Sequence, residues 1–250
     1  MAAEKSLAIV LRVVEFSETS CVVTLFTDKL GKITALAKGA RRPKSSFESA
    51  LDLLAVVRIL FLHKSSDTLD LLTEAKLERR FRAAARDLSR LYAGYYVAEL
   101  LRELTDANDP HPDLFAVADQ TLQLLDGEAS VAATVLWFEL AALRLLGHSP
   151  SLRECVECGE VVEASPRAAF GLLAGGVLCT KCRAGQRQVV SVSAGGLAAV
   201  RHLSAVTGDE AAQYAEPKVL GELRGVLNNY IAHLLGHKPR LQAYLGTLVG

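Results

Sequence analysis

Four cysteines in two C-x-x-C pairs are the residues of this sequence best suited to chemistry. Cys155 and Cys158 form the first pair, and Cys179 and Cys182 follow after an interval of 20 residues. This interval lies at the upper edge of the spacing typical of zinc ribbons. Gly159 follows the first pair and "AGG" precedes the second, so each pair can sit on a tight turn. Four thiolates can then converge on one tetrahedral Zn²⁺.

The predicted zinc site is structural rather than catalytic. Four thiolates complete the tetrahedron and leave no position for water or a substrate. Two disulfides are the alternative, but in a reducing compartment this pattern favours metal. Contact with nucleic acid is an alternative to a purely structural role, because the surrounding segment carries Arg153, Arg167, Lys181, Arg183 and Arg187.

A short loop, "KGARRPKSS" at residues 38–46, is the second candidate site. Lys38, Arg41, Arg42 and Lys44 place four cations within seven residues, although the whole chain has 28 Lys+Arg against 28 Asp+Glu. Lysine and arginine donate hydrogen bonds to phosphate oxygens and fix a protein on a nucleic-acid backbone. We therefore predict that this loop binds DNA.

Two residues beside the loop extend the predicted DNA-binding set. Lys32 lies at the other end of the preceding strand, and Phe47 follows the loop closely enough to stack on a base. Pro43 stiffens the loop and lowers the entropy lost when it orders on a ligand. The alternative is a solvated charge run, which is what most such runs are.

The first 77 residues are expected to form the strands that position this loop. Short segments rich in β-branched residues lie at 7–16, 20–27, 31–38, 54–63 and 68–77. Five short strands predict a small, closed or nearly closed barrel, and small Greek-key barrels often bind single strands across one face. Gly31 is free to take a positive φ in one turn, and Cys21 is expected to be a buried thiol.

From residue 78 onward the hydrophobic pattern is helical. Apolar residues recur at helical spacing over 78–104, 112–127, 130–147, 194–206 and 217–236. Ser130 is the expected N-cap of the third helix, and Pro217 suits the first turn of the last one. The predicted fold class is multidomain α+β. Its parts are a barrel at 1–79, a helical domain at 80–150 and 186–250, and a zinc module at 151–185.

Several function classes lack their motifs. The sequence contains no P-loop, no G-x-G-x-x-G and no H-E-x-x-H, and its histidines are scattered. We find no set of positioned catalytic groups, so we do not expect an enzyme. The N-terminus has no signal-peptide h-region, and Glu139 and Arg144 interrupt the longest apolar run, which predicts a soluble, cytoplasmic protein.

These motifs together resemble the RecO family of bacterial recombination mediators. The stretches "KGARRPKS", "LRLLGHSPSLRECVECG", "GGVLCTKC" and "YIAHLLGHKPRLQAYL" carry the resemblance, which covers nearly the whole chain. It implies an oligonucleotide-binding barrel, a helical domain and a zinc module. It also implies binding of single- and double-stranded DNA, annealing of complementary strands, and a place with the nucleoid. The family's DNA-contacting loop corresponds to residues 38–44.

The resemblance also implies protein partners. These are RecR, the acidic tail of the single-stranded-DNA-binding protein and, indirectly, the RecA recombinase. We expect an apolar groove for the tail in the helical part. Candidates for a basic clamp beside that groove are Arg201, Arg224, Lys238 and Arg240.

Two other classes of protein stay open. One is a zinc-ribbon factor of transcription or translation, which would prefer a specific site or a ribosomal RNA. The other is a nuclease in which the zinc is only a scaffold. The first would discriminate against random DNA, and the second would degrade DNA in the presence of Mg²⁺.

Overall fold

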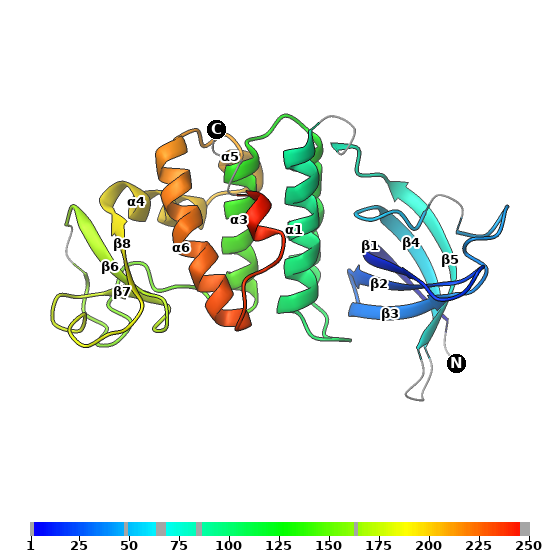
Figure 1. The fold of residues 1–250 in the computed structure, drawn as a ribbon, viewed down its shortest axis with the longest axis horizontal. Helices are drawn as coiled ribbons and strands as arrows, with labels where there is room; N and C mark the ends of the chain where they lie inside the picture. The colour runs from blue at the N-terminus through cyan, green and yellow to red at the C-terminus, as the bar shows by residue number, and fades with distance from the viewer. Residues whose placement is uncertain (1–2, 48–49, 64–68, 84–86, 163–164, 246–250) are drawn as a thin grey trace. The chain divides into compact units, whose positions relative to one another are not determined.

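The computed structural model describes residues 3–47, 50–63, 69–83, 87–162 and 165–245. The chain divides into two compact units, Met1–Gly127 and Glu128–Gly250, and each is described by itself. The first unit holds a β-barrel and two helices, and the second holds a small sheet and the remaining helices (Figure 1). The finer division into four parts that the sequence suggests stays a prediction.

The barrel closes on itself through five strands. They are β1 (Ala3–Glu15), β2 (Cys21–Thr27), β3 (Gly31–Ala37), β4 (Val56–Leu62) and β5 (Asp70–Arg79). The strands follow one another in the order β1-β2-β3-β5-β4, and β4 pairs back onto β1. Only the β3–β5 pair is parallel. The five strands expected from the sequence and the closed barrel are confirmed.

Every second side chain along a strand points into the barrel, and these side chains fill its interior. In β3, buried and more exposed residues alternate along the strand, as expected for a strand with one face toward a core. The core also takes in Cys21, which is buried as predicted, and burial raises the pKa of its thiol. Large members of this core are Val23, Leu25, Ile33, Val57, Ile59 and Phe61.

Two helices complete the first unit. Helix α1 (Leu88–Leu104) begins after Asp87, whose carboxylate caps it by accepting from the backbone N–H of Ser89 at 2.8 Å. The hydroxyl and the N–H of Ser89 lower the pKa of Asp87. Helix α2 (Pro112–Asp126) begins with proline, where the missing N–H costs no hydrogen bond.

The start of α1 differs from the sequence-based expectation. The helical pattern was expected from residue 78, but residues 78 and 79 belong to β5 and the helix begins ten residues later. Residues 84–86 lie outside the described residues. Phe81 occupies an apolar position of the expected helix and is buried. Burial of an apolar side chain in a connecting segment therefore imitates helical periodicity.

The second unit combines helices with a three-stranded sheet. The helices are α3 (Val131–Leu145), α4 (Ala194–Leu203), α5 (Gly208–Ala211), α6 (Pro217–Leu235) and α7 (Gln242–Leu245). Ser130 caps α3 and Pro217 begins α6, as predicted. Helices α3 and α6 pack side by side (Figure 1). Between them Arg224 Nη1 lies 2.9 Å from Glu139 Oε1, and both side chains are buried.

The sheet reaches beyond the predicted zinc module. Its strands are β6 (Arg167–Gly171), β7 (Gly176–Leu178) and β8 (Val189–Ser193), with β6 in the centre. Strand β8 follows the expected boundary at residue 185 and leads directly into α4. In the described part of the chain, no helix is both long enough and apolar enough to span a membrane.

Candidate nucleic-acid interface and metal centre

The basic loop, residues 38–46, is held at both ends by hydrogen bonds to the barrel. Near its start, the backbone N–H of Arg41 donates to the carbonyl of Thr19 at 3.1 Å. At its end, the hydroxyl of Ser46 donates to the carbonyl of Thr73, on β5, at 3.1 Å. These contacts hold the loop against two different parts of the barrel, which lowers the entropy it would lose on binding a ligand.

The four predicted cations of the loop, Lys38, Arg41, Arg42 and Lys44, are all exposed. Arg41 forms an ion pair with Glu15 at 2.9 Å. The other three have no ion pair with any carboxylate in the described part of the chain. Exposed pairs of this kind are worth about 0–1 kcal/mol. A phosphate can therefore replace Glu15 at little cost.

Lys32, which the sequence places among the DNA contacts, lies at the C-terminal end of α1. Its ammonium donates to the backbone carbonyls of Arg102, at 2.5 Å, and of Thr105. These carbonyls belong to the last turn and C-cap of α1, where the helix dipole favours a cation. Burial lowers the pKa of Lys32, and Asp106 opposes that shift. The cation therefore ties the barrel to α1.

Phe47, which the sequence predicts to stack on a base, is buried in this structure. Its side chain is only 4% exposed and belongs to the barrel core. A ring buried among apolar side chains has no free face on which a base can stack. Phe47 instead anchors the end of the basic loop in the core.

The two cysteine pairs lie on neighbouring turns of the second unit. The first turn closes through the N–H of Gly159, which donates to the carbonyl of Cys155 at 2.8 Å. The second pair directly follows β7. The segment before the first pair runs beside β7, and a Cβ at Gly176 would lie 2.7 Å from the Cβ of Ser151. Glycine there permits the close approach that brings the pairs together.

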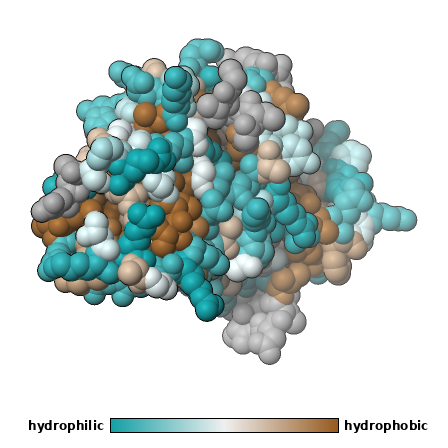
Figure 2. All heavy atoms as spheres, turned by 60° about the vertical axis from the view of Figure 1, so that its left-hand side comes forward, coloured by the Kyte–Doolittle hydropathy of each residue, from teal (hydrophilic) through white to brown (hydrophobic). Residues whose placement is uncertain are grey.

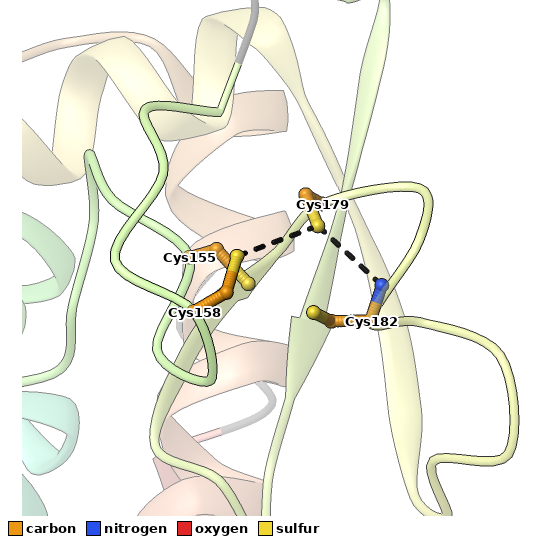
Figure 3. Close-up of side chains that lie close together, drawn as sticks. All are labelled: Cys155, Cys158, Cys179 and Cys182. Carbon is orange, nitrogen blue, oxygen red and sulfur yellow. Dashed lines mark hydrogen bonds between the residues drawn. The ribbon is translucent and has the colours of Figure 1, made fainter.

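The four sulfur atoms converge on one point (Figure 3). All lie within 4.8 Å of one another, and the Sγ atoms of Cys158 and Cys179 are 3.9 Å apart. A disulfide would require about 2.05 Å, and none of the five cysteines is in one. Zn–S bonds of about 2.3 Å in a tetrahedron place the sulfurs about 3.8 Å apart. The donor set and its geometry can hold a zinc ion.

Cys155 differs from its neighbours in burial and in acidity. Its side chain is buried, whereas Cys158 is exposed. Burial opposes ionisation of Cys155, but backbone N–H groups of Cys179, Cys158 and Glu157 outweigh it and lower its pKa to about 6. Backbone donors that stabilise a thiolate also suit a sulfur bound to a metal, since only the thiolate is a ligand.

The surface around the cysteines combines apolar and charged side chains. Figure 2 turns this part of the chain forward and shows apolar and hydrophilic side chains beside one another. Val161 is 73% exposed. Among the basic residues, Arg167 lies 3.4 Å from Glu222 and Lys181 lies 3.6 Å from Glu160. Two of the four cations within residues 151–185 are therefore partly neutralised by neighbouring carboxylates.

Comparison with known proteins places both parts of the chain in one family. A model described as recombination protein O N terminal matches residues 1–81, and one described as recombination protein O C terminal matches residues 85–242. The chain belongs to the RecO family. A DNA repair protein RecO of Rhodopirellula baltica is 46% identical over 96% of this chain and 97% of its own length. Another, of Myxococcus xanthus, is 35% identical over 92% of each chain.

RecO membership confirms the resemblance seen in the sequence and supports a role in DNA repair and recombination, with DNA binding. Among the residues expected to clamp a partner's tail, Arg224 is excluded because it is buried against Glu139. Arg201 is partly buried and donates to the carbonyl of Leu152 at 2.9 Å. Lys238 and Arg240 are exposed and stay predictions.

Proposed function

We propose that this RecO-family chain is a recombination mediator that binds single- and double-stranded DNA through the basic loop of its barrel. The observation that carries the proposal is the loop itself, residues 38–46. It displays Lys38, Arg41, Arg42 and Lys44 to solvent while hydrogen bonds hold it to the barrel. Exposed cations on a fixed loop suit phosphate contacts that are independent of sequence.

Annealing of complementary strands follows from the same chemistry. Two strands repel each other through their phosphates, and a basic surface lowers that repulsion without nucleotide hydrolysis. The sequence contains no P-loop, which agrees with activity that needs no ATP. The proposal therefore assigns the chain a non-enzymatic role in the cytoplasm, at the nucleoid.

The proposed partners act together with DNA. With RecR, the chain helps to load RecA onto DNA coated by single-stranded-DNA-binding protein. The acidic tail of that protein docks on the helical part, and Lys238 and Arg240 are the remaining clamp candidates because both are exposed. Charge-assisted hydrogen bonds from these side chains suit the carboxylates of such a tail.

The cysteine cluster is proposed to hold one structural zinc ion. Cys155, Cys158, Cys179 and Cys182 would be its four ligands, and their convergence supports this assignment. Bound zinc would crosslink two turns and add folding free energy to the second unit. Its complete shell of thiolates gives it no catalytic position.

An annealing reaction tests the proposal. Complementary oligonucleotides carrying a fluorophore and a quencher are coated with single-stranded-DNA-binding protein and mixed with this chain in the absence of ATP. We expect quenching, as duplex forms, to be faster than without the chain. The combined variant Lys38→Ala, Arg42→Ala, Lys44→Ala should lose most of this acceleration.

The matched control is Arg58→Ala, which removes an exposed arginine of β4 that pairs with Glu78. It should anneal like the unaltered chain. No acceleration by the unaltered chain would refute the proposed activity. Oligonucleotides shortened after long incubation with Mg²⁺ would instead identify a nuclease, and strong preference for one sequence or RNA would identify a transcription or translation factor.

A further inference from the structure

One aromatic side chain of the barrel faces solvent. Residues 1–81 contain five phenylalanines and no tyrosine or tryptophan. Phe26, Phe47, Phe61 and Phe81 are buried, but Phe16 is 64% exposed. An exposed phenylalanine ring forgoes the free energy that burial would give it. It directly follows β1 and lies beside the basic loop, where a bound ligand could cover it.

The turn that carries Phe16 is well connected. The backbone N–H groups of Phe16 and Ser17 both donate to the carbonyl of Ser20, at 3.0 and 3.1 Å. Ser17 Oγ in turn accepts from the N–H of Ser20 at 3.2 Å. These bonds close the connection between β1 and β2 into a compact turn, so the ring projects from an ordered backbone.

The same turn is hydrogen-bonded to the basic loop. The N–H of Gly39 donates to Ser20 Oγ at 3.3 Å, and the N–H of Arg41 donates to the carbonyl of Thr19 at 3.1 Å. A Cβ at Gly39 would lie 3.5 Å from Cδ of Arg42, so the stem of Arg42 lies against this glycine. The aromatic turn and the cationic loop therefore form one surface.

A shallow depression lies between the turn and the loop. Phe16, Leu36, Lys38, Gly39 and Arg42 are among the residues that line it. It thus brings together a solvent-exposed ring, two cations and the partly buried side chain of Leu36. Lys38 and Arg42 have no ion pair with a carboxylate among the described residues, unlike Arg41, which Glu15 partly neutralises. Their charge is available to an external anion.

We propose that Phe16 is the platform on which one unpaired DNA base stacks, with Lys38 and Arg42 holding phosphates beside it. This inference rests on the proposed DNA binding. Aromatic stacking and cations along the backbone are the two parts of a sequence-independent single-strand site. Since a base in a duplex already stacks on its neighbours, the platform favours single strands and can hold a base unpaired before annealing.

The test compares Phe16→Ala with the unaltered chain by fluorescence anisotropy of a labelled thymidine oligonucleotide at constant salt. We expect binding to be weaker by about 5- to 140-fold, the loss of one stacked base. Affinity for a blunt duplex should change by less than about twofold, because its bases offer no free face. Phe16→Tyr keeps the ring and should bind single strands like the unaltered chain.

Two controls separate stacking from other effects. Leu77→Ala removes another exposed apolar side chain of the barrel, 38% exposed on β5, and should not alter binding. An oligonucleotide without bases should bind the unaltered chain about as weakly as normal DNA binds Phe16→Ala. With that oligonucleotide, Phe16→Ala should cause no further loss.

A direct signal comes from Phe16→Trp. The single natural tryptophan, Trp137, is 6% exposed, so the added fluorescence reports on the exposed position. We expect thymidine oligonucleotides to quench this added fluorescence and base-free oligonucleotides to leave it unchanged. Equal quenching by both would overturn stacking.

The outcomes distinguish this inference from the proposed function. If Lys38→Ala with Arg42→Ala weakens binding but Phe16→Ala does not, the stacking platform is refuted and DNA binding by the loop stands. If Phe16→Ala weakens the binding of single strands and of duplex equally, the ring supports the shape of the loop and does not hold a base. The stacking platform is then refuted as well. If the unaltered chain binds no DNA, both proposals fail.

Discussion

The ammonium of Lys32 lies 2.5 Å from the carbonyl oxygen of Arg102, seventy positions further along the chain. This contact joins the start of β3 to the last turn of α1. The neighbouring backbone reinforces it, because the N–H of Asn108 donates to the carbonyl of Lys32 at 2.9 Å. A cation that the sequence places among DNA contacts thus belongs to the framework of the first unit.

Lys32→Met should therefore destabilise the fold without altering DNA binding. Loss of the cation leaves two carbonyls at the end of α1 without their donor, and hydrogen bonds to charged groups are worth about 1.5–3 kcal/mol. Chemical unfolding should show a loss of this size. Lys29→Met, at an exposed lysine of the neighbouring turn, is the control and should be nearly silent. A weaker dependence of DNA binding on salt in Lys32→Met would show that Lys32 contacts a phosphate after all.

The basic loop should dominate the salt dependence of single-strand binding. The slope of log affinity against log salt is negative, and Arg42→Ala should reduce its magnitude by about 0.7, the contribution of one phosphate contact. Arg41→Ala should lower it less, because Glu15 already competes for that guanidinium. Glu15→Gln should tighten binding at low salt. Salt titrations of all three variants test whether the loop contacts phosphates. Lines parallel to that of the unaltered chain would mean that the loop is only a solvated run of charges.

Zinc should be lost when one of its proposed ligands is removed. Cys158→Ser leaves three thiolates, so we expect elemental analysis to fall from one zinc per chain toward zero. Thermal stability should fall as well, since structural zinc contributes folding free energy directly. Cys21→Ala removes a buried thiol of the barrel and should retain the metal. Much less than one zinc on pure, unchelated protein would contradict the site.

The buried ion pair between Arg224 and Glu139 should stabilise the second unit and should not bind a partner's acidic tail. Arg224→Ala leaves Glu139 charged and buried, which typically costs about 3–5 kcal/mol. Unfolding in denaturant should show this loss. Combining Arg224→Met with Glu139→Leu should recover most of it, because two apolar side chains need no counter-ion. A stable Arg224→Ala that binds the partner's tail more weakly would contradict this prediction.

Local patterns in the sequence predicted most of the architecture. Alternation of polar and apolar residues placed β2 and β3 within one residue of their observed ends. The spacing of Cys155, Cys158, Cys179 and Cys182 predicted their convergence. The capping residue Ser130 and the first-turn residue Pro217 correctly predicted where α3 and α6 begin. Each of these signals lies within a few residues of the feature it specifies, or depends on a fixed ligand geometry.

The sequence could not show the environments that distant parts of the chain create. Lys32 donates a hydrogen bond to the last turn of α1, and Phe47 packs in the barrel core. Residue type alone cannot tell a lysine that meets a helix end from one that meets a phosphate. The same limit hid Phe16, since the five phenylalanines of residues 1–81 are equivalent until burial separates them. The polar run "SETS" after Phe16 was the one local hint of its exposure.

Closure of the barrel has a consequence for many copies gathered on one DNA molecule. Binding along a strand raises the local concentration of protein, and an open sheet under those conditions presents unpaired backbone groups to its neighbours. Here every strand of the barrel is paired on both sides. The barrels of neighbouring copies therefore offer one another no open strand edge, however closely they lie along the DNA.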